Sequence, residues 1–177
     1  LGLILASEEV VSALFGYGSF TLDNVKMTAS ALEFFGYGVP AFALIKILSN
    51  FFFARNNTKT PFYISAFIVI LNIILSISFF DKIGFVIIPI ATSISTWAGV
   101  IMYIYFLNKK NYLLFKNYLP KNIVKILLST ILMSFLLIFA LDYFIDYLDY
   151  TYQYKSVYLL LIVSFAAVVY LISCYLT

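Results

Sequence analysis

Long runs of apolar residues constrain the fold of this sequence more than any other feature. A helix needs about 20 apolar residues to cross a bilayer, and five runs reach that length. They cover residues 27–54, 61–80, 85–107, 123–147 and 157–176. Because lipid offers a backbone no hydrogen-bond partners, such runs predict helices, which pair their own N–H and C=O groups. The chain is 64% hydrophobic and 11% charged, whereas soluble domains are about 25% charged, so a water-soluble fold is excluded.

The first 15 residues are apolar but too short to span a bilayer, and they predict the end of a partial helix. The sequence starts inside this helix at Leu1, without Met, and ends at Thr177 directly on an apolar run. We therefore expect a fragment of a larger protein. The predicted fold class is an all-α, polytopic membrane helical bundle with about five full transmembrane helices and a partial one at the N-terminus.

Positive charges gather in two of the predicted loops. Residues 54–60 contain Arg55 and Lys59, and residues 108–125 contain five lysines. The loops at the opposite ends hold fewer cations, including Lys155, and these are offset by aspartates. The positive-inside rule therefore places loops 54–60 and 108–125 in the cytoplasm. The apolar residues between the lysines of 108–125 also predict an interfacial stretch on an anionic membrane face.

The loop before the last run is acidic and rich in tyrosine. Its acids are Asp142, Asp146 and Asp149, and tyrosines lie between and after them. Tyrosine is enriched where a membrane meets water, so this stretch predicts an interfacial turn on the outer side.

Residues 36–61 combine a helix-length apolar run with features that a purely structural helix rarely needs. Pro40 and its neighbouring glycines are expected to break the helix near one end. Lys46 would lie about 12 Å from the basic turn, so its ammonium could only partly reach water. Broken helices and intramembrane charges often mark substrate or ion paths in transporters. A structural charge satisfied by neighbouring helices is the alternative for Lys46, and an interfacial position is favoured for Glu33.

The two runs that follow carry polar residues on one helical face each. These are Ser65, Asn72 and Ser76 on residues 61–80, and Thr92, Ser95, Thr96 and Gly99 on residues 85–107. The short turn between the runs makes them antiparallel neighbours, so we expect Asn72 and Ser76 to meet Thr92 and Thr96. This contact is either ordinary interhelical hydrogen bonding or an ion or ligand site.

The sequence offers little for catalysis. Histidine is absent and Cys174 is the single cysteine, so the commonest proton shuttle and metal ligand are missing. We expect no enzyme activity, no catalytic residue and no nucleic-acid partner.

Three stretches resemble a known family. They are Leu14–Thr21, Tyr37–Lys46 and Phe53–Pro61. They are similar to the MurJ/MviN family of bacterial lipid II flippases, within the multidrug/oligosaccharidyl-lipid/polysaccharide exporter group. The resemblance covers the whole chain in segment order and is most specific in the first 61 residues.

This resemblance implies helices nine (partial) to fourteen of a fourteen-helix protein. Residues 1–107 would be the back half of the second lobe, and residues 108–177 would be a basic cytoplasmic loop with two added helices. The family's cytoplasmic termini agree with the orientation predicted from the lysines alone.

The resemblance also implies a function. The family moves the undecaprenyl-linked precursor of peptidoglycan from the inner to the outer leaflet of the plasma membrane by alternating access. Its added helices would form a groove for the lipid tail. The expected partners are this lipid-linked precursor, membrane lipids and the missing N-terminal lobe. The residues expected to line the substrate pathway or to take part in gating are Lys46, Arg55, Glu33 and Pro40.

A sodium site is a further implication of the resemblance. It would use Asn72, the backbone oxygen of Ile88, and Thr92. Ser76 stands where a carboxylate is expected, and the missing charge should weaken a site for a hard cation. The resemblance implies no cofactor other than this sodium ion, and no other metal is expected.

Three other classes of protein remain as alternatives. The first is a polysaccharide-repeat or multidrug exporter of the same group. The second is a membrane-embedded enzyme that acts on prenyl phosphates, with the outer aspartates as its acids. The third is a membrane scaffold without transport activity, against which the intramembrane Lys46 argues.

Overall fold

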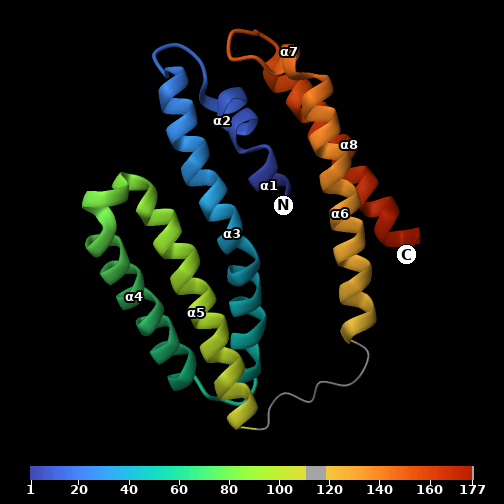
Figure 1. Cartoon of the computed structure of the whole chain (residues 1–177). Helices are drawn as coiled ribbons and strands as arrows, with labels where there is room; N and C mark the ends of the chain where they lie inside the picture. Colours follow the sequence, from blue (N-terminus) through green and yellow to red (C-terminus); the bar gives the residue numbers. More distant parts are fainter. Residues whose placement is uncertain (111–118, 177) are drawn as a thin grey trace. The chain divides into compact units, whose positions relative to one another are not determined.

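The computed structural model describes the backbone of residues 1–110 and 119–176, and the side chains of residues 1–110 and 125–175. Figure 1 shows the helices in chain order. They are α1 (Gly2–Leu5), α2 (Ser7–Phe15), α3 (Leu22–Phe53), α4 (Lys59–Ile83), the 3-10 turn η1 (Gly84–Val86), α5 (Ile87–Lys109), α6 (Leu119–Tyr143), α7 (Ile145–Leu148) and α8 (Lys155–Leu176). No strand occurs in this described part of the chain, which confirms the all-α prediction.

Four helical stretches are long and apolar enough to cross a membrane. They are Leu22–Phe53, Lys59–Lys109, Lys125–Tyr143 and Lys155–Tyr175. The second has 51 residues, far more than the about 20 that one span needs, because it contains both α4 and α5. These two helices form a hairpin around η1 (Figure 1). The described residues therefore contain five helices of spanning length, as predicted.

The N-terminal partial helix differs from the prediction. It is divided at Ala6, whose backbone has φ −114° and ψ 26°, into the short helices α1 and α2.

Local side-chain chemistry sets the helix ends. Thr21 Oγ1 accepts a hydrogen bond of 3.4 Å from the backbone N–H of Asn24, so α3 begins at Leu22, earlier than its apolar run suggests. Asn57 precedes α4 and its side chain accepts the Thr60 N–H at 3.2 Å. Gly84 ends α4 with φ +73°, a conformation that favours glycine.

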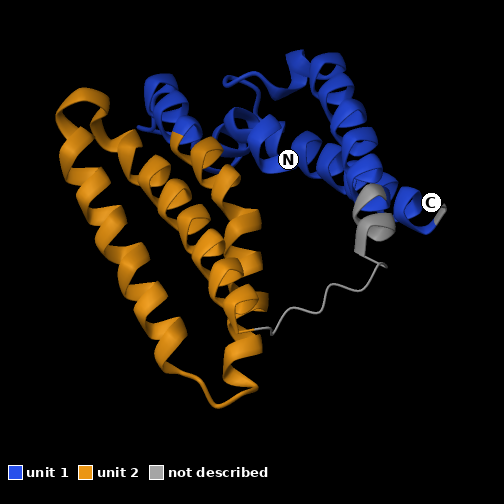
Figure 2. Ribbon diagram, turned by 60° about the horizontal axis from the view of Figure 1, so that its bottom comes forward, with its two compact units in different colours: residues 1–30, 115–177 blue, residues 31–114 orange. Residues whose placement is uncertain are grey.

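The chain forms two compact units, shown in different colours in Figure 2. One unit comprises residues 1–30 and 115–177, and the other comprises residues 31–114. Helix α3 contributes its first turns to the former and the rest to the latter. The predicted division at residue 107 concerns the lobes of a complete protein, and it stays a prediction.

The unit of residues 31–114 is built from most of α3 with α4 and α5. Its buried cluster is Ala41, Leu48, Phe52, Ile64, Val100, Tyr103 and Leu107. The rings of Phe52 and Tyr103 lie 5.9 Å apart between α3 and α5. Large apolar side chains such as Ile77 (73% exposed) cover the outer helix faces, which suits contact with lipid tails.

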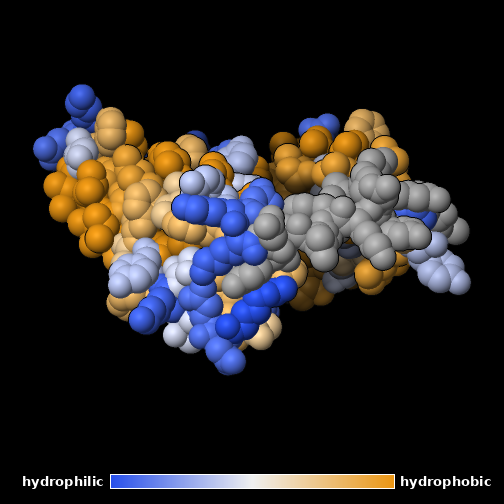
Figure 3. Space-filling view, turned by 90° about the horizontal axis from the view of Figure 1, so that it is seen from below, coloured by the Kyte–Doolittle hydropathy of each residue, from blue (hydrophilic) through white to orange (hydrophobic). Residues whose placement is uncertain are grey.

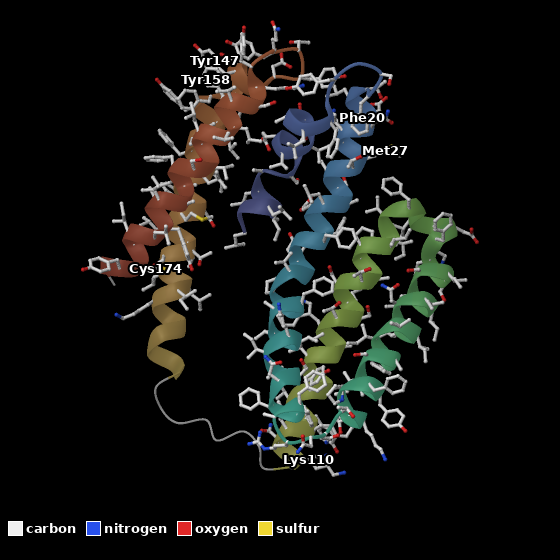
Figure 4. The ribbon with its side chains drawn as sticks, turned by 180° about the vertical axis from the view of Figure 1, so that it is seen from behind. Phe20, Met27, Lys110, Tyr147, Tyr158 and Cys174 are labelled. Carbon is white, nitrogen blue, oxygen red and sulfur yellow. The ribbon has the colours of Figure 1, made fainter. Side chains whose placement is uncertain are left out.

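The other unit packs α6 against α8, with α7 in the turn between them, and α1 and α2 contact α6 and α8 respectively. Its buried cluster is Ala6, Ala13, Leu137, Leu141, Leu148, Leu159, Ile162 and Ala166. The tyrosine-rich turn forms an aromatic cluster, in which the rings of Tyr147 and Tyr158 stack 4.8 Å apart (Figure 4). The aromatic character of this turn was predicted, but the short helix α7 within it was not.

Candidate functional site

A polar contact joins α4 to α5 in the middle of the hairpin. Asn72 Nδ2 donates a hydrogen bond of 2.9 Å to Thr92 Oγ1, and that hydroxyl donates one of 2.7 Å to the carbonyl of Ile88. The structure thus brings together the three residues that the resemblance assigns to a sodium site. Their polar groups also satisfy one another as interhelical hydrogen bonds, and cation binding stays a prediction.

The second expected pair of this contact is absent from the described residues. Thr96 Oγ1 donates to the carbonyl of Thr92 in its own helix, at 2.6 Å, instead of reaching Ser76. Helical threonines often bond the preceding turn in this way, which periodicity alone does not reveal. Ser76 Oγ is buried and has no hydrogen-bond partner among the described residues. An unpaired buried hydroxyl costs about 1–3 kcal/mol, so an added partner at Ser76 would be stabilising.

Helix α3 runs through Pro40 without interruption, so the predicted break at residues 36–40 is wrong. Proline lacks an N–H and displaces the carbonyls of the preceding turn. Helix α5 supplies side-chain donors to that part of α3. Ser93 Oγ donates to the carbonyl of Phe34 at 2.6 Å, and Trp97 Nε1 donates to the carbonyl of Tyr37 at 3.0 Å. These bonds reach carbonyls on either side of Gly36, whose own carbonyl loses its helical partner because Pro40 has no N–H.

Gly38 allows this close approach of α3 and α5. A Cβ atom at this position would lie 2.7 Å from Ser93 Oγ and 3.3 Å from Ser93 Cα. The glycine therefore positions α3 for the hydrogen bonds on either side of it. Gly38 is one of the glycines near Pro40 that were expected to break the helix, and its packing role was not predicted.

Lys46 and Glu33 take no part in the Asn72–Thr92 contact or in the hydrogen bonds between α3 and α5. Lys46 is exposed on α3, and no hydrogen bond or ion pair reaches its ammonium from the part of the chain that the structure describes. Glu33 is partly buried and lies on α3 about two helical turns before Pro40. Pro40 itself is exposed. The structure leaves their roles in a substrate pathway untested.

Arg55 lies at the C-terminal end of α3. Its Nη1 donates a hydrogen bond of 2.9 Å to the carbonyl of Phe51, where a cation also complements the helix dipole. Lys110, at the end of α5, has its Nζ 5.9 Å from the centre of the Phe52 ring (Figure 4). Arg55 and Lys110, one from each predicted cytoplasmic loop, therefore lie at the same end of this unit.

The view from this end shows hydrophilic side chains gathered beside apolar helix flanks (Figure 3). The predicted interfacial stretch between residues 108 and 125 lies mainly outside the described residues.

Lys155 is the charged residue that sequence analysis placed least well. It was counted among the loop cations, yet it is 1% exposed. Its ammonium donates hydrogen bonds of 2.8 Å to the carbonyls of Gly16 and Tyr150. The rings of Tyr17 and Tyr150 each lie 4.5 Å from Nζ, in cation–π contact.

Neighbouring hydroxyls extend this contact. Ser156 Oγ donates to the carbonyl of Ala13 at 2.7 Å and lies 2.6 Å from the Tyr17 hydroxyl. The Tyr150 hydroxyl donates to the carbonyl of Phe20. Together these bonds hold the start of α8 and the turn before it against the end of α2 and the turn between α2 and α3. An apolar run that begins directly after a lysine gives no signal of such burial.

An apolar groove lies between α6 and α8. It has a volume of about 520 Å³. Its lining residues are Leu136, Phe139, Ala140, Tyr143, Phe144, Tyr158, Leu161, Ile162 and Phe165. The two helices that form it are the pair expected to contact a lipid tail.

Comparisons with known proteins give the chain its family. The family model described as lipid II flippase MurJ matches residues 1–169. A probable lipid II flippase MurJ of Buchnera aphidicola is 38% identical over 95 residues, which are 54% of this chain and 18% of that protein. The lipid II flippase MurJ of Thermosipho africanus is 32% identical over 133 residues, which are 74% of this chain and 26% of that protein.

A solved structure is also similar. It is the lipid II flippase MurJ in an inward closed conformation, at a TM-score of 0.74 and 27% sequence identity. The match covers 97% of this chain and 33% of the solved one. The chain thus spans about a quarter or less of the curated relatives named above and a third of the solved protein. With several apolar helices of spanning length, the chain is a multi-pass protein of the bacterial inner membrane, and it belongs to the lipid II flippase MurJ family.

Proposed function

We propose that this chain is the back part of a flippase that moves the undecaprenyl-linked peptidoglycan precursor, lipid II, from the inner to the outer leaflet by alternating access. The observation that carries the proposal is the family match over residues 1–169, supported by a similar structure along 97% of the chain. The protein would be a transporter without a covalent step, in which the outer aspartates are interfacial residues.

The groove between α6 and α8 is proposed to contact the prenyl tail of the substrate. Its walls are apolar apart from two tyrosine hydroxyls. A long hydrocarbon chain needs dispersion contacts and little directional bonding, which such walls supply. Large exposed side chains near the groove, such as Phe165 (57% exposed), make its outer side accessible to lipid.

The exposed face of α3 is proposed to line the passage, with Lys46 as its cation and Glu33, Pro40 and Arg55 as further pathway or gating residues. An unpaired ammonium within a spanning helix is unfavourable in lipid. Lys46 has no described partner within this chain, so a partner from the first lobe or from the substrate is required. Because the precursor is anionic, a lysine suits the passage that it crosses.

A sodium ion is proposed as a coupling ion at Asn72, Thr92 and the Ile88 carbonyl, with Ser76 at its edge. The support is the direct contact of the first three groups. Hydroxyl, amide and carbonyl oxygens are suitable ligands for a hard cation. Asn72 now directs Nδ2 to Thr92, so ion binding would require its amide to turn the oxygen inward, and a carboxylate at position 76 would bind more tightly.

The experiment that tests the passage uses the full-length protein in a strain depleted of its own flippase. Lys46→Ala should abolish growth while membrane levels stay normal, because the passage would lose its cation. Lys82→Ala is the matched control, since Lys82 is an exposed lysine at the end of α4. Full growth with Lys46→Ala would reduce Lys46 to a structural charge.

A further inference from the structure

The contact around Lys155 lies directly before α3, the helix proposed to line the passage. The Lys155 ammonium donates to the carbonyl of Gly16, and the Tyr150 hydroxyl donates to the carbonyl of Phe20. Helix α3 begins two residues after Phe20, at Leu22. Two residues of chain span at most about 7 Å, so the position of this contact limits where α3 can begin.

The first turn of α3 is itself packed in the same compact unit. Val25 is 0% exposed, and it lines one cavity together with Leu141 of α6 and Leu148 of α7. The start of α3 therefore belongs to the unit formed by residues 1–30 and 115–177, although the rest of the helix does not.

The ammonium of Lys155 is enclosed on all sides. The residue is 1% exposed, and besides its two carbonyl acceptors it interacts electrostatically with the Asp149 carboxylate. A Cβ atom on Gly16 would lie 2.9 Å from Nζ, so a glycine at this position permits the close approach. Separating the two sides without admitting water would leave a charge and two carbonyls unpaired, which is strongly unfavourable.

Hydroxyl groups join the same two segments at further points. Ser156 Oγ donates to the carbonyl of Ala13 and lies 2.6 Å from the Tyr17 hydroxyl. All these bonds run between residues 13–20 and residues 150–156. Several bonds would have to break together for the segments to part, so the contact should stay closed.

We propose that Lys155 is a positioning residue for transport. It holds the start of α8 and the turn before α3 together as one rigid body throughout the transport cycle, and it thereby fixes the end of α3 that is predicted to face outward. The proposal rests on the proposed function, in which α3 lines the passage. The pair α6 and α8 then has a second role besides its apolar groove, which is to brace a helix of the passage.

The test crosslinks the contact in full-length protein that is free of native cysteines, Cys174→Ser included. Tyr17→Cys and Ser156→Cys replace two side chains whose hydroxyls lie 2.6 Å apart, and a short bismethanethiosulfonate reagent joins the two thiols reversibly. Flipping of lipid II is measured in proteoliposomes before crosslinking, after it, and after reduction. The crosslinked protein should flip as fast as the reduced protein, and the reagent should not change either single-cysteine variant. Flipping that stops on crosslinking and returns on reduction would show that the contact must open, which overturns the proposal.

Substitution of the lysine tests the positioning role directly. Lys155→Met should slow flipping at least about threefold at a temperature below its melting point, because the start of α3 is no longer fixed. Lys82→Met is the matched control, at an exposed lysine at the end of α4, and should flip like the parent protein. The crosslink between positions 17 and 156 should restore flipping in Lys155→Met. A folded Lys155→Met protein that flips as fast as its parent refutes the role.

A second variant serves if Lys155→Met does not fold. Ser156→Ala removes two hydrogen bonds of the contact without removing the charge, so it should also slow flipping. Unchanged flipping in Ser156→Ala would then refute the role. Flipping by the untreated parent tests the proposed function, whereas the ratio of each variant to the parent tests the role of Lys155, so the two can fail separately.

Discussion

The ammonium of Lys155 donates to carbonyls from two different turns and lies against two tyrosine rings, whereas that of Lys46 is exposed on a spanning helix. Lys46 lies inside a long apolar run and Lys155 lies just before one, so their positions in the sequence suggested the opposite order of burial. The difference arises from tertiary contacts. A buried lysine bonded to two carbonyls holds structure together, whereas a lysine in a span without a partner among the described residues needs one from elsewhere.

The Lys155 contact should therefore contribute to stability. Lys155→Met removes two hydrogen bonds from a charged donor and leaves the Gly16 and Tyr150 carbonyls unpaired. We expect the full-length protein to lose about 2 kcal/mol of stability, seen as a lower melting temperature. Lys82→Met, at an exposed lysine, should leave the melting temperature unchanged. Equal melting temperatures for Lys155→Met and the parent protein would contradict the role of this contact.

Ser76 offers a test of the cation site at the same scale. Ser76→Asp adds the carboxylate that a hard-cation site prefers beside Asn72 and Thr92, so half-maximal transport should require less sodium. Ser76→Ala is the control, because it removes an unpaired hydroxyl without adding charge. Sodium dependence measured by flipping in proteoliposomes distinguishes the two. An unchanged dependence in Ser76→Asp would leave the Asn72–Thr92 bond as simple helix packing.

At the scale of helices, the sequence predicted best those features that depend on a single physical effect, such as the length of an apolar run. Apolar length determines which segments are helices, and all five spanning helices were predicted from it. The period of the polar residues also predicted that Asn72 and Thr92 meet. Helix starts were harder, because a cap such as Thr21 extends α3 beyond its apolar run. The uninterrupted course of α3 through Pro40 was not predicted, and neither were the hydrogen bonds that α5 donates to two carbonyls of this part of α3.

The contact between α3 and α5 gives a prediction at this scale. Gly38→Ala places a methyl group 2.7 Å from Ser93 Oγ and 3.3 Å from Ser93 Cα, so the Ser93 side chain must turn away or the helices must move apart. We expect a loss of about 1–3 kcal/mol in stability, measured by thermal unfolding of the full-length protein.

A double variant identifies the cause of that loss. Ser93→Ala removes the atom that the new methyl group would meet, so in the Gly38→Ala background it should recover part of the stability. Val39→Leu, at an exposed position on the same helix, should have little effect. A Gly38→Ala protein as stable as its parent would show that the two helices do not depend on close approach here.

For the whole molecule, membership of the family accounts for polar groups on these helices, such as the Lys46 ammonium, that have no partner among the described residues. The chain spans a third of the solved flippase that it resembles, so most of the passage would come from other parts of the protein. Hydropathy and lysine distribution predicted a multi-pass membrane protein, and the motifs in the first 61 residues predicted its family. The buried contact of Lys155 depends on groups far apart in sequence, and the sequence alone did not predict it.

The most direct test of the flippase assignment measures where lipid II resides. Cells depleted of their own flippase would express the full-length protein that contains this chain, and a membrane-impermeant enzyme that cleaves lipid II would be added to the outer side. If the protein flips lipid II, cleavage should return to the level of undepleted cells, and it should fall again with Lys46→Ala. Lipid II that stays protected from cleavage, while the protein is present in the membrane at normal levels, would contradict the assignment.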